Sequence, residues 1–512
     1  MNGAENLIRT LVENGVNTCF ANPGTSEMHF VAALDHVPGM KSILCLFEGV
    51  VTGAADGYAR MTGKPACTLL HLGPGLANGL ANLHNARRAG VPLLNIVGDH
   101  ASYHLELDAP LTSDIKGFAS PVSGWIRHSS SAESVAQDTA DGISAALEGQ
   151  IATLILAADT AWSKSTVTAE LVEKRPGAIV ADDIISQAQT ALLSGEPCAF
   201  LFNGEGTSAA CLEVAGKIAK KTGARLLADT FVSRLSRGAG RVDVERIPYF
   251  AESAIELLAP IKHLILVSSK APVAFFAYPG IESVLAGPGC EIIKLAKAGD
   301  NIPEAMLHLA DVLDAGAVQA DVVSLDLPNL PGGVLNGESI GQSVAHFIPD
   351  NTIVVNEAIT SGMMLPAITR SARPHDWLDT TGGAIGQGMP CATGAAIACP
   401  DRKVLCLQAD GSAMYTVQAL WTQSREKLDV VTVIFANNKY AILQVELMRV
   451  GAENPGRNAM DMLDIGRPTI DWVKMAESMG VEASRATTAE EFNHQLERAI
   501  NSTGPKLIEA II

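Results

Sequence analysis

The sequence has 512 residues, of which 47% are hydrophobic and 18% are charged. A chain of this length predicts about three domains rather than one. The 37 Lys and Arg residues are outnumbered by 55 Asp and Glu residues, which gives a net charge of −18 at pH 7. This acidic balance disfavours nucleic acid and anionic membranes as partners. The composition is typical of a large α/β protein with well-buried cores.

Nine cysteines are spread along the chain, with no CxxC pair and no metal-ligand spacing to histidine. They indicate buried thiols in a reducing compartment. Residues 1–19 place Glu5, Arg9 and Glu13 among apolar residues at helical spacing, which predicts an amphipathic helix rather than a signal peptide. The sequence has no apolar stretch of about 18 residues that could span a membrane. We therefore expect a cytoplasmic protein without a membrane partner.

Short apolar runs alternate with helical patterns throughout the chain. In the first third, an apolar run at 64–70 is followed by a helical pattern at 76–88 and a second apolar run at 92–97. This alternation is typical of βαβ units and predicts an α/β fold with mostly parallel, doubly wound sheets. Periodicity is lost at 161–177 and at 325–337. We therefore predict three domains, at 1–165, 178–325 and 337–512.

Polar side chains follow two neighbouring predicted strands in the last third. Asp410, Gly411 and Ser412 come after the strand at 404–408, and an Asn-Asn pair comes after the strand at 430–435. A carboxylate and an amide at adjacent strand ends can share one divalent ion, which in turn holds phosphate oxygens. Gly411 allows close backbone approach, and Ser412 can donate at a helix start. A lone Asp-Gly-Ser is more often a capped turn, but the Asn pair favours the metal site.

This pattern resembles the thiamine diphosphate-dependent enzymes, in the group that contains acetolactate synthase and benzoylformate decarboxylase. Their fingerprint is a Gly-Asp-Gly turn followed by paired asparagines, and Ala409 replaces the first glycine here. The resemblance covers essentially the whole chain. It implies a pyrimidine-binding, a central and a diphosphate-binding domain in that order, with thiamine diphosphate and Mg²⁺ as cofactors. The metal ligands that it implies are Asp410, Asn437 and the carbonyl of Lys439. The alternative is Asn438 with the carbonyl of Tyr440.

Glu48 precedes a helical pattern rich in alanine and glycine and is flanked by apolar residues. A carboxylate at a helix start is commonly just a favourable partner of the helix dipole. The apolar neighbours predict partial desolvation and a raised pKa, which suits proton exchange near neutral pH. In the family that the chain resembles, a glutamate in this context hydrogen-bonds the aminopyrimidine ring and activates the cofactor. The match extends through Gly53, Asp56, Gly57 and Arg60.

A second candidate region, from His71 to Asn78, ends the next predicted strand. The resemblance makes Asn78 a neighbour of the cofactor and places His71 on the substrate side, as in benzoylformate decarboxylase. Acetolactate synthases usually carry a small hydroxyl residue there. His71 is therefore a candidate for proton transfer, and a merely packed histidine is the alternative. Two further histidines, His100 and His104, are weaker candidates.

The glycine-rich segment 382–390 predicts a loop that passes close to another group. The resemblance places this loop along the cofactor, with Ile385 supporting the bent cofactor rings. Thr360 follows the strand at 352–355 and is a candidate hydroxyl donor to the diphosphate. The residues expected to bind the cofactor are Asn78, Thr360, Gly383, Ile385, Gly411, Ser412 and Tyr440.

These features predict an enzyme that uses thiamine diphosphate and Mg²⁺ on a small 2-oxo acid, either as an acetolactate-synthase-like carboligase or as a non-oxidative decarboxylase. One alternative is a benzoylformate-decarboxylase-like enzyme for an aryl 2-oxo acid. That family member has a second catalytic histidine in its central domain, whereas segment 271–280 has none and contains Phe275 and Phe276, which could simply be core. A catalytically silent paralogue is disfavoured by Glu48, and a nicotinamide enzyme by the lack of G-x-G-x-x-G after the first strand.

The resemblance also implies an assembly. In the family, Glu48 and Asn78 act on a cofactor whose diphosphate is held by the third domain of another subunit. We therefore expect at least a homodimer, doubled to a homotetramer, with one site shared between two chains. The small-residue helices predicted at 50–61 and 391–398 are expected to supply the interface.

Overall fold

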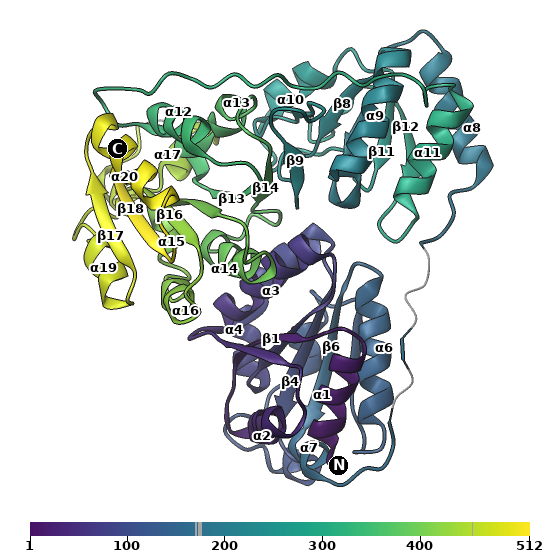
Figure 1. The fold of residues 1–512 in the computed structure, drawn as a ribbon, viewed down its shortest axis with the longest axis vertical. Helices are drawn as coiled ribbons and strands as arrows, with labels where there is room; N and C mark the ends of the chain where they lie inside the picture. The colour runs from purple at the N-terminus through teal and green to yellow at the C-terminus, as the bar shows by residue number, and fades with distance from the viewer. Residues whose placement is uncertain (169–170, 173–176, 453) are drawn as a thin grey trace.

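The computed structural model of the 512-residue chain describes every residue except 169–170, 173–176 and 453. Three sheets, of six, five and seven strands, form the centres of three α/β units (Figure 1). The first unit lies at the bottom of Figure 1, the central unit at the upper right and the third at the upper left. This architecture confirms the predicted three-domain α/β fold. The predicted boundary at 161–177 includes residues outside the described part of the chain.

The first sheet is entirely parallel, with the order β2-β1-β3-β4-β6-β5. Its strands are β1 (Thr18–Asn22), β2 (Lys41–Leu44), β3 (Ala66–Leu70), β4 (Leu93–Asp99), β5 (Trp125–His128) and β6 (Ile151–Ala157). Its helices are α1 (Gly3–Glu13), η1 (Thr25–Glu27), α2 (Met28–His36), α3 (Glu48–Thr62), α4 (Leu72–Ala89), η2 (Ser102–Leu107), α5 (Ile115–Ala119), α6 (Val135–Leu147) and α7 (Ala158–Trp162). The helix predicted over 1–19 is shorter than expected, because Gly15 turns the chain at φ +76° and β1 takes its last residues.

The central sheet is also parallel, with the order β10-β8-β7-β11-β12. Its strands are β7 (Cys198–Phe202), β8 (Arg225–Ala228), β10 (Glu245–Arg246), β11 (His263–Val267) and β12 (Glu291–Ala296). Its helices are α8 (Asp182–Leu193), η3 (Gly204–Thr207), α9 (Ala209–Thr222), α10 (Ala251–Leu258) and α11 (Ile302–Val312). An extended segment then runs along the upper edge of the molecule to the third unit (Figure 1).

The third sheet has the order β17-β18-β16-β15-β13-β14-β9. Its own strands are parallel, namely β13 (Thr352–Glu357), β14 (His375–Asp379), β15 (Val404–Ala409), β16 (Val430–Ala436), β17 (Glu482–Ala486) and β18 (Lys506–Ile511). Strand β9 (Leu235–Arg237) comes from the central segment and pairs antiparallel with β14. The helices are α12 (Gly337–Phe347), η4 (Ile359–Gly362), α13 (Leu365–Ile368), α14 (Gly388–Ala398), α15 (Asp410–Ala413), α16 (Ala419–Arg425), α17 (Ala441–Arg449), α18 (Arg457–Asp461), α19 (Trp472–Ser478) and α20 (Ala489–Ile500).

Glycines allow α3 and α14 to pack closely against each other. A Cβ atom at Gly57 would lie 2.0 Å from the carbonyl oxygen of Cys391, and one at Gly394 would lie 1.8 Å from that of Ala54. Only glycine fits such positions, so the two small-residue helices predicted from the sequence form one tight interface. The structure places this interface within one chain, between the first and third units, whereas we expected these helices to serve contacts between chains. Apolar side chains of both units join there in a single core.

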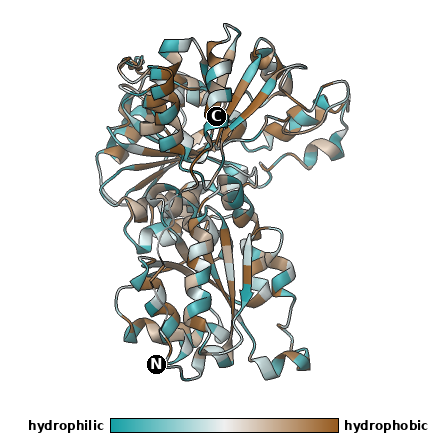
Figure 2. Cartoon of the chain, turned by 90° about the vertical axis from the view of Figure 1, so that its right-hand side faces the viewer, coloured by the Kyte–Doolittle hydropathy of each residue, from teal (hydrophilic) through white to brown (hydrophobic). Residues whose placement is uncertain are grey.

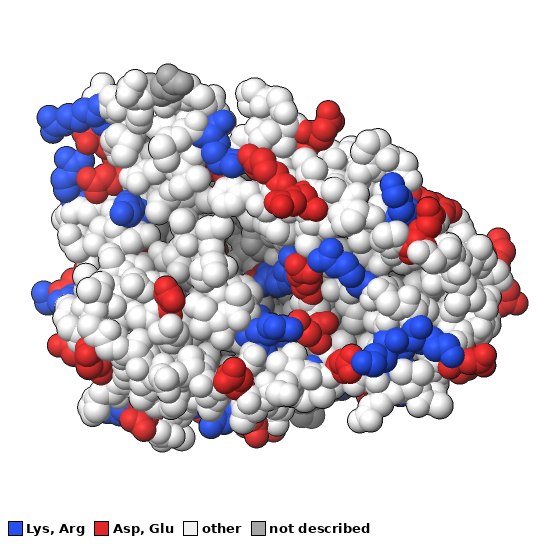
Figure 3. Space-filling model, turned by 90° about the horizontal axis from the view of Figure 1, so that it is seen from above, with Lys and Arg blue, Asp and Glu red and all other residues white. Residues whose placement is uncertain are grey.

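The surface and the strands differ in polarity. The strands are coloured largely as hydrophobic in Figure 2, which agrees with sheets buried on both faces. On the face shown in Figure 3, acidic and basic side chains are interspersed and large areas carry neither. No helix in the described part of the chain is long and apolar enough to cross a membrane.

Candidate active site

Glu48 is the first residue of α3 and is 8% exposed. Its carboxylate accepts two side-chain hydrogen bonds, from Asn22 Nδ2 to Oε1 (3.2 Å) and from Asn78 Nδ2 to Oε2 (3.0 Å). Asn22 ends β1 and Asn78 lies in α4, so three elements converge on one carboxylate. The predicted pair of Glu48 and Asn78 is thus in direct contact. Sequence analysis missed Asn22, although its position at the end of the first strand was a usable signal.

His71 lies next to the same glycine, Gly75, as this carboxylate. It is the N-cap residue of α4, and a Cβ atom at Gly75 would lie 3.3 Å from the Cβ of His71 and 3.4 Å from Glu48 Oε1. His71 Nδ1 is 2.8 Å from the carboxylate of Glu27, which is 3% exposed. Burial raises the pKa of Glu27, while His71 and the Gly24 N–H oppose that shift. Sequence analysis did not identify Glu27, because its partner is 44 residues away in the chain.

Asp410 occupies the corresponding place in the third unit, after β15 and at the start of α15. Its carboxylate accepts backbone hydrogen bonds from the N–H groups of Asn438 (2.7 Å) and Gly411 (2.8 Å). Burial raises the pKa of Asp410, and the backbone N–H donors oppose this. A Cβ atom at Gly411 would lie 2.5 Å from the ring of Tyr440, so the aromatic ring covers this turn. The structure therefore brings together the predicted residues Asp410, Gly411 and Tyr440.

The two asparagines point in different directions. Asn437 Nδ2 donates to Ser361 Oγ (3.2 Å), and Asn437 Oδ1 accepts from the Lys439 N–H (3.0 Å). The Cβ atom of Asn438 instead lies 3.3 Å from where a Gly466 Cβ would be, and the Asn438 carbonyl accepts from Ile465. Asn437 therefore faces the hydroxyl-bearing η4 segment, where the diphosphate donors were expected, and Asn438 does not.

The two candidate carbonyl groups differ as well. The Tyr440 carbonyl accepts hydrogen bonds from Leu443 (3.0 Å) and Gln444 (3.3 Å) at the start of α17. No backbone N–H of the described residues donates to the Lys439 carbonyl. Hard oxygen donors of this kind fit Mg²⁺, so the residues present fit the ion. Among the described residues, no group of three or more His, Cys, Asp or Glu side chains could hold a metal. A cation here would therefore take one carboxylate and complete its shell with neutral oxygens and phosphate.

The hydroxyl groups of η4 follow strand β13. The side chain that contacts Asn437 belongs to Ser361, whereas Thr360 was the residue predicted from the sequence. Ser412 Oγ lies in α15 and donates to the Ala409 carbonyl (3.2 Å). Ser361 thus joins Thr360 and Ser412 as a hydroxyl group near the predicted diphosphate site.

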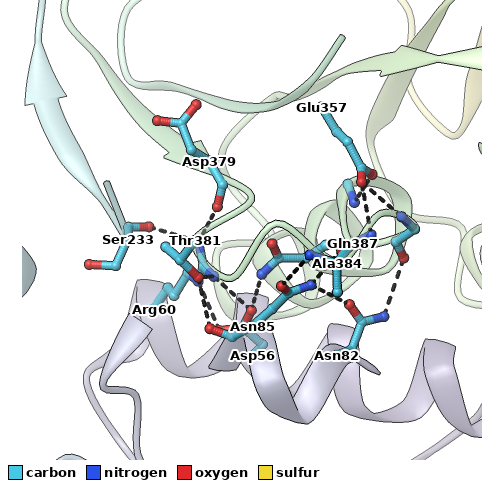
Figure 4. A network of polar contacts seen from close by, with 12 residues as sticks. Asp56, Arg60, Asn82, Asn85, Ser233, Glu357, Asp379, Thr381, Ala384 and Gln387 are labelled. Carbon is cyan, nitrogen blue, oxygen red and sulfur yellow. Dashed lines mark hydrogen bonds and ion pairs between the residues drawn. The ribbon is translucent and has the colours of Figure 1, made fainter. Parts of the chain in front are cut away.

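Glu357 anchors the backbone of the glycine-rich loop. Its buried carboxylate accepts hydrogen bonds from the N–H groups of Gly386 (2.8 Å), Gln387 (3.4 Å) and Gly388 (2.7 Å), and from Gln408 Nε2 (2.9 Å). Burial raises the pKa of Glu357, and these four donors oppose that shift. Figure 4 shows the carboxylate directed at the loop backbone. The sequence analysis gave Glu357 no role, although it is the last residue of β13.

The glycine-rich loop also contacts the first unit. Asn82 Nδ2 donates to the carbonyl oxygens of Gly49 (2.8 Å) and Gly386 (3.2 Å), and Asn85 Nδ2 donates to Ala384 (2.7 Å) (Figure 4). Gly49 directly follows Glu48, and Ile385 lies between the two loop residues that are contacted. The start of α3 and the loop that carries Ile385 are therefore neighbours within one chain.

An ion pair extends this contact along α3. Arg60 pairs with Asp56 (2.8 Å), donates to the Asp379 carbonyl (2.7 Å) and reaches Thr381 Oγ1 (3.0 Å). Gln387 Nε2 donates to the same Asp56 carboxylate (Figure 4). Asp56 and Arg60, which were matched to the family motif, thus join the first unit to the third.

The central unit contributes an aromatic surface next to this loop. Gly383 has φ +74°, and a Cβ atom there would lie 2.7 Å from the ring of Phe275. Phe275 and Phe276 are 43% and 53% exposed, so neither is a core residue. The rings of the weaker candidates His100 and His104 lie next to each other, with centroids 5.3 Å apart and planes tilted by 55°.

Together, a buried carboxylate held by amides, a second buried carboxylate at the strand ends of the third sheet and the glycine-rich loop lie at the carboxyl edges of parallel sheets, where α/β enzymes bind their cofactors. Residues 1–120 match the N-terminal TPP-binding domain of thiamine pyrophosphate enzymes, and residues 360–510 match their C-terminal TPP-binding domain. TPP is thiamine diphosphate.

Comparisons over the full length agree. A Mycobacterium tuberculosis protein provisionally named as the acetolactate synthase large subunit IlvX is 53% identical over 514 residues, covering 100% of this chain and 99% of that protein. Benzoylformate decarboxylase of Pseudomonas aeruginosa is 26% identical, over 98% of this chain and 96% of that one. The chain therefore belongs to the thiamine pyrophosphate enzymes, in the group of acetolactate synthase and benzoylformate decarboxylase.

A solved structure shares the fold. The thiamine diphosphate-dependent 4-hydroxybenzoylformate decarboxylase of Rhodococcus jostii RHA1 has a TM-score of 0.85 and 23% identity to this chain. The match covers 99% of this chain and 98% of that one. The likeness confirms the predicted arrangement of three α/β units.

Proposed function

We propose that this protein uses thiamine diphosphate and Mg²⁺ to remove carbon dioxide from a small 2-oxo acid. When bound, thiamine diphosphate would supply a carbon nucleophile for the 2-oxo group and a ring that accepts the electron pair left behind by carbon dioxide. The observation that carries the proposal is Glu48, a buried carboxylate held by Asn22 and Asn78. Such a group can exchange a proton with a ring nitrogen without moving, since its two amide donors fix its position.

The other predicted residues have separate roles. Asp410, Asn437 and the Lys439 carbonyl would hold the ion, and Gly411, Ser412, Thr360 and Ser361 would face the diphosphate. Asn438 with the Tyr440 carbonyl remains the alternative ligand pair. Ile385 and Gly383, on the loop anchored by Glu357, would support the rings. His71 would hold or release a proton at the substrate.

Two outcomes of the reaction are open to this site. The fragment that remains after carbon dioxide leaves is either protonated and released as an aldehyde, or joined to a second carbonyl compound, as in an acetolactate-synthase-like carboligase. The name of the 53% identical relative favours the carboligase. His71 favours protonation, because a titratable ring that shares Gly75 with Glu48 as a neighbour can deliver a proton.

A benzoylformate-decarboxylase-like activity on an aryl 2-oxo acid is the second candidate. It is supported by an aromatic cluster beside the glycine-rich loop, in which Phe275 lies 5.6 Å from Phe231, 5.4 Å from Tyr249 and 5.0 Å from Phe276 between ring centroids. Exposed aromatic rings are suited to stacking on an aryl substrate. The segment lacks a histidine, so any proton transfer would depend on His71.

The test is a panel of aliphatic and aryl 2-oxo acids, assayed for released carbon dioxide with product analysis, in the presence and absence of thiamine diphosphate and Mg²⁺. Release that requires both cofactors supports the proposal, and the products separate aldehyde from ligated compound. Tight cofactor binding without carbon dioxide release from any acid would instead indicate a catalytically silent paralogue.

We further infer a homodimer or homotetramer, as the family resemblance implies. The contacts of Asn82 bring the loop and the start of α3 together in one chain, so subunit mixing must decide where the site is completed. A mixture of Glu48→Gln and Asp410→Ala chains regains activity if the site is shared between subunits. No recovery after verified subunit exchange would place both halves of the site in a single chain.

A further inference from the structure

The pair of Glu27 and His71 is built more tightly than a surface ion pair. Glu27 Oε2 accepts from the Gly24 N–H (2.7 Å) and lies 2.8 Å from His71 Nδ1. A Cβ atom at Gly24 would lie 2.3 Å from the His71 ring, so the ring packs directly on the Gly24 backbone. The orientation of the His71 ring is therefore set by Glu27 at its Nδ1 edge and by the Gly24 backbone on one face.

The second oxygen of Glu27 is left without a partner. Glu27 Oε1 is buried and accepts no hydrogen bond from the described residues. A Cβ atom at Gly98 would lie 1.7 Å from this oxygen, so the backbone of β4 closes over it. A fully ionised carboxylate is costly in such a place, because one oxygen loses its hydration without compensation. Sharing a proton with His71 through Oε2 lowers the negative charge on the carboxylate and so reduces that cost.

Another Glu–His pair in the chain has the same local design in a different setting. Glu5 Oε2 accepts from the Asn2 N–H (3.0 Å), and Glu5 Oε1 lies 2.9 Å from His36 Nδ1. The His36 side chain is 66% exposed, compared with 23% for His71. The pKa of Glu5 is lowered, mainly by its hydrogen bonds and its pairing with His36, although burial acts in the opposite direction. The surface pair is thus a matched control for the buried one.

We propose that Glu27 is a positioning residue for His71, which holds Nδ1 on its carboxylate and presents Nε2 to the substrate. The proposal rests on the proposed function, because it assigns His71 to proton transfer beside Glu48. Nε2 makes no hydrogen bond with the described residues. With Nδ1 committed to Glu27, the tautomer is fixed, and the two groups carry one shared proton that Nε2 can use.

Other titratable groups lie on the elements packed around the pair. Glu48 adjoins Gly75, and the other groups on these elements are His29, Asp35 and His36 on α2, His84, Arg87 and Arg88 on α4, Asp99 at the end of β4 and Lys116 on α5. Asp99 is engaged by the His100 N–H (2.8 Å) and lies 3.8 Å from His128. Of these groups, Glu48 shares Gly75 with His71 as a neighbour, so its protonation must be held constant when the pair is titrated.

A purely structural role for Glu27 is the competing account, since Glu27 also caps the turn at Gly24. Glu27→Gln separates the two, because the amide oxygen still accepts from the Gly24 N–H while the charge is lost. We expect Glu27→Gln to fold normally. We also expect the titration midpoint of His71 to fall, as measured by ¹⁵N NMR of labelled histidines in the cofactor-free protein. The His71→Gln spectrum assigns the signal. Glu5→Gln should lower the midpoint of His36 alone.

Activity gives the second readout. With a 2-oxo acid that the wild type decarboxylates, we expect Glu27→Gln to lower kcat by about 10-fold or more, with a smaller change in KM and a shifted pH profile. In a His71→Gln background the same change should have no further effect, and Glu5→Gln should leave activity unchanged. An unaltered His71 midpoint in folded Glu27→Gln, or an equal loss of kcat in both backgrounds, would overturn the proposal. The NMR result holds even if no 2-oxo acid is a substrate.

Discussion

The carboxyl edges of the first and third sheets each carry buried carboxylates, yet the two edges hold them differently. In the first unit, Glu48 and Glu27 are contacted by side chains, which are two asparagines and one histidine. In the third unit, Asp410 and Glu357 are held largely by backbone N–H groups, which belong to Gly411 and Asn438 for Asp410 and to the glycine-rich loop for Glu357.

The difference indicates a division of labour. Backbone donors are fixed by the fold and favour a permanently placed negative charge, which suits a cation and the anchoring of a loop. Side-chain partners such as His71 can themselves gain or lose protons, which suits proton exchange. On this account the first edge performs the chemistry of the proposed reaction, and the third edge holds the cofactor.

The largest expected effect comes from Glu48→Gln. The amide keeps the size of the side chain but cannot exchange the activating proton, so turnover should fall by about 10²-fold or more while the fold is retained. The measurement is the rate of carbon dioxide release, with Glu13→Gln on the exposed face of α1 as control. Near-native rates would remove Glu48 from its assigned role.

At the third edge, Asp410→Ala should weaken cofactor binding on the order of 100-fold, because the cation that joins protein and diphosphate loses its carboxylate. Asn437→Ala should shift the Mg²⁺ concentration needed for activity, and Asn438→Ala should not. A titration with Mg²⁺ at fixed thiamine diphosphate checks both. A shift in Asn438→Ala alone would favour the alternative ligands Asn438 and Tyr440.

Glu357→Gln tests whether a fixed charge anchors the loop. The amide would turn one NH₂ group toward backbone donors, so we expect a loss of about 1–3 kcal/mol in the free energy of unfolding. Denaturant titration measures this, with Glu338→Gln in the exposed first turn of α12 as control. Unchanged stability would mean that the loop does not depend on Glu357.

His375 on β14 should contribute a pH dependence of stability that is separate from catalysis. Burial lowers its pKa from 6.5 to about 4, so the folded state disfavours the charged ring. Its stabilising effect is present above pH 6.5 and is lost as the pH falls toward 4. Between pH 7 and 5 we expect the wild type to lose about 2 kcal/mol more than His375→Gln. Parallel stability curves for the two proteins would contradict this.

Sequence patterns predicted the parts of the molecule that depend on neighbours along the chain. Apolar runs located β3, β4, β7 and β15, the strand-end pattern singled out Asp410, and the family resemblance singled out Glu48 and Asn78. What was missed depends on tertiary contacts. Strand β9 has three residues, and its pairing with β14 is supported by Ser236 donating to Asp376 (2.7 Å), 140 residues away.

The same reason explains the missed site residues. Glu27 and Glu357 carry no motif of their own, and each becomes notable only through a buried partner on another element. The two asparagines could not be separated by spacing, because they are adjacent in sequence. In the fold their hydrogen bonds and those of the following carbonyl groups differ, and this difference supports Asn437 in the proposal.

The division of roles between the two sheet edges is tested most directly by calorimetry. Thiamine diphosphate, together with Mg²⁺, is titrated into the wild type, Glu48→Gln and Asp410→Ala. The account predicts that Glu48→Gln binds the cofactor about as tightly as the wild type although it does not turn over, and that Asp410→Ala loses Mg²⁺-dependent binding. Wild-type affinity in Asp410→Ala, or loss of binding in folded Glu48→Gln, would contradict it.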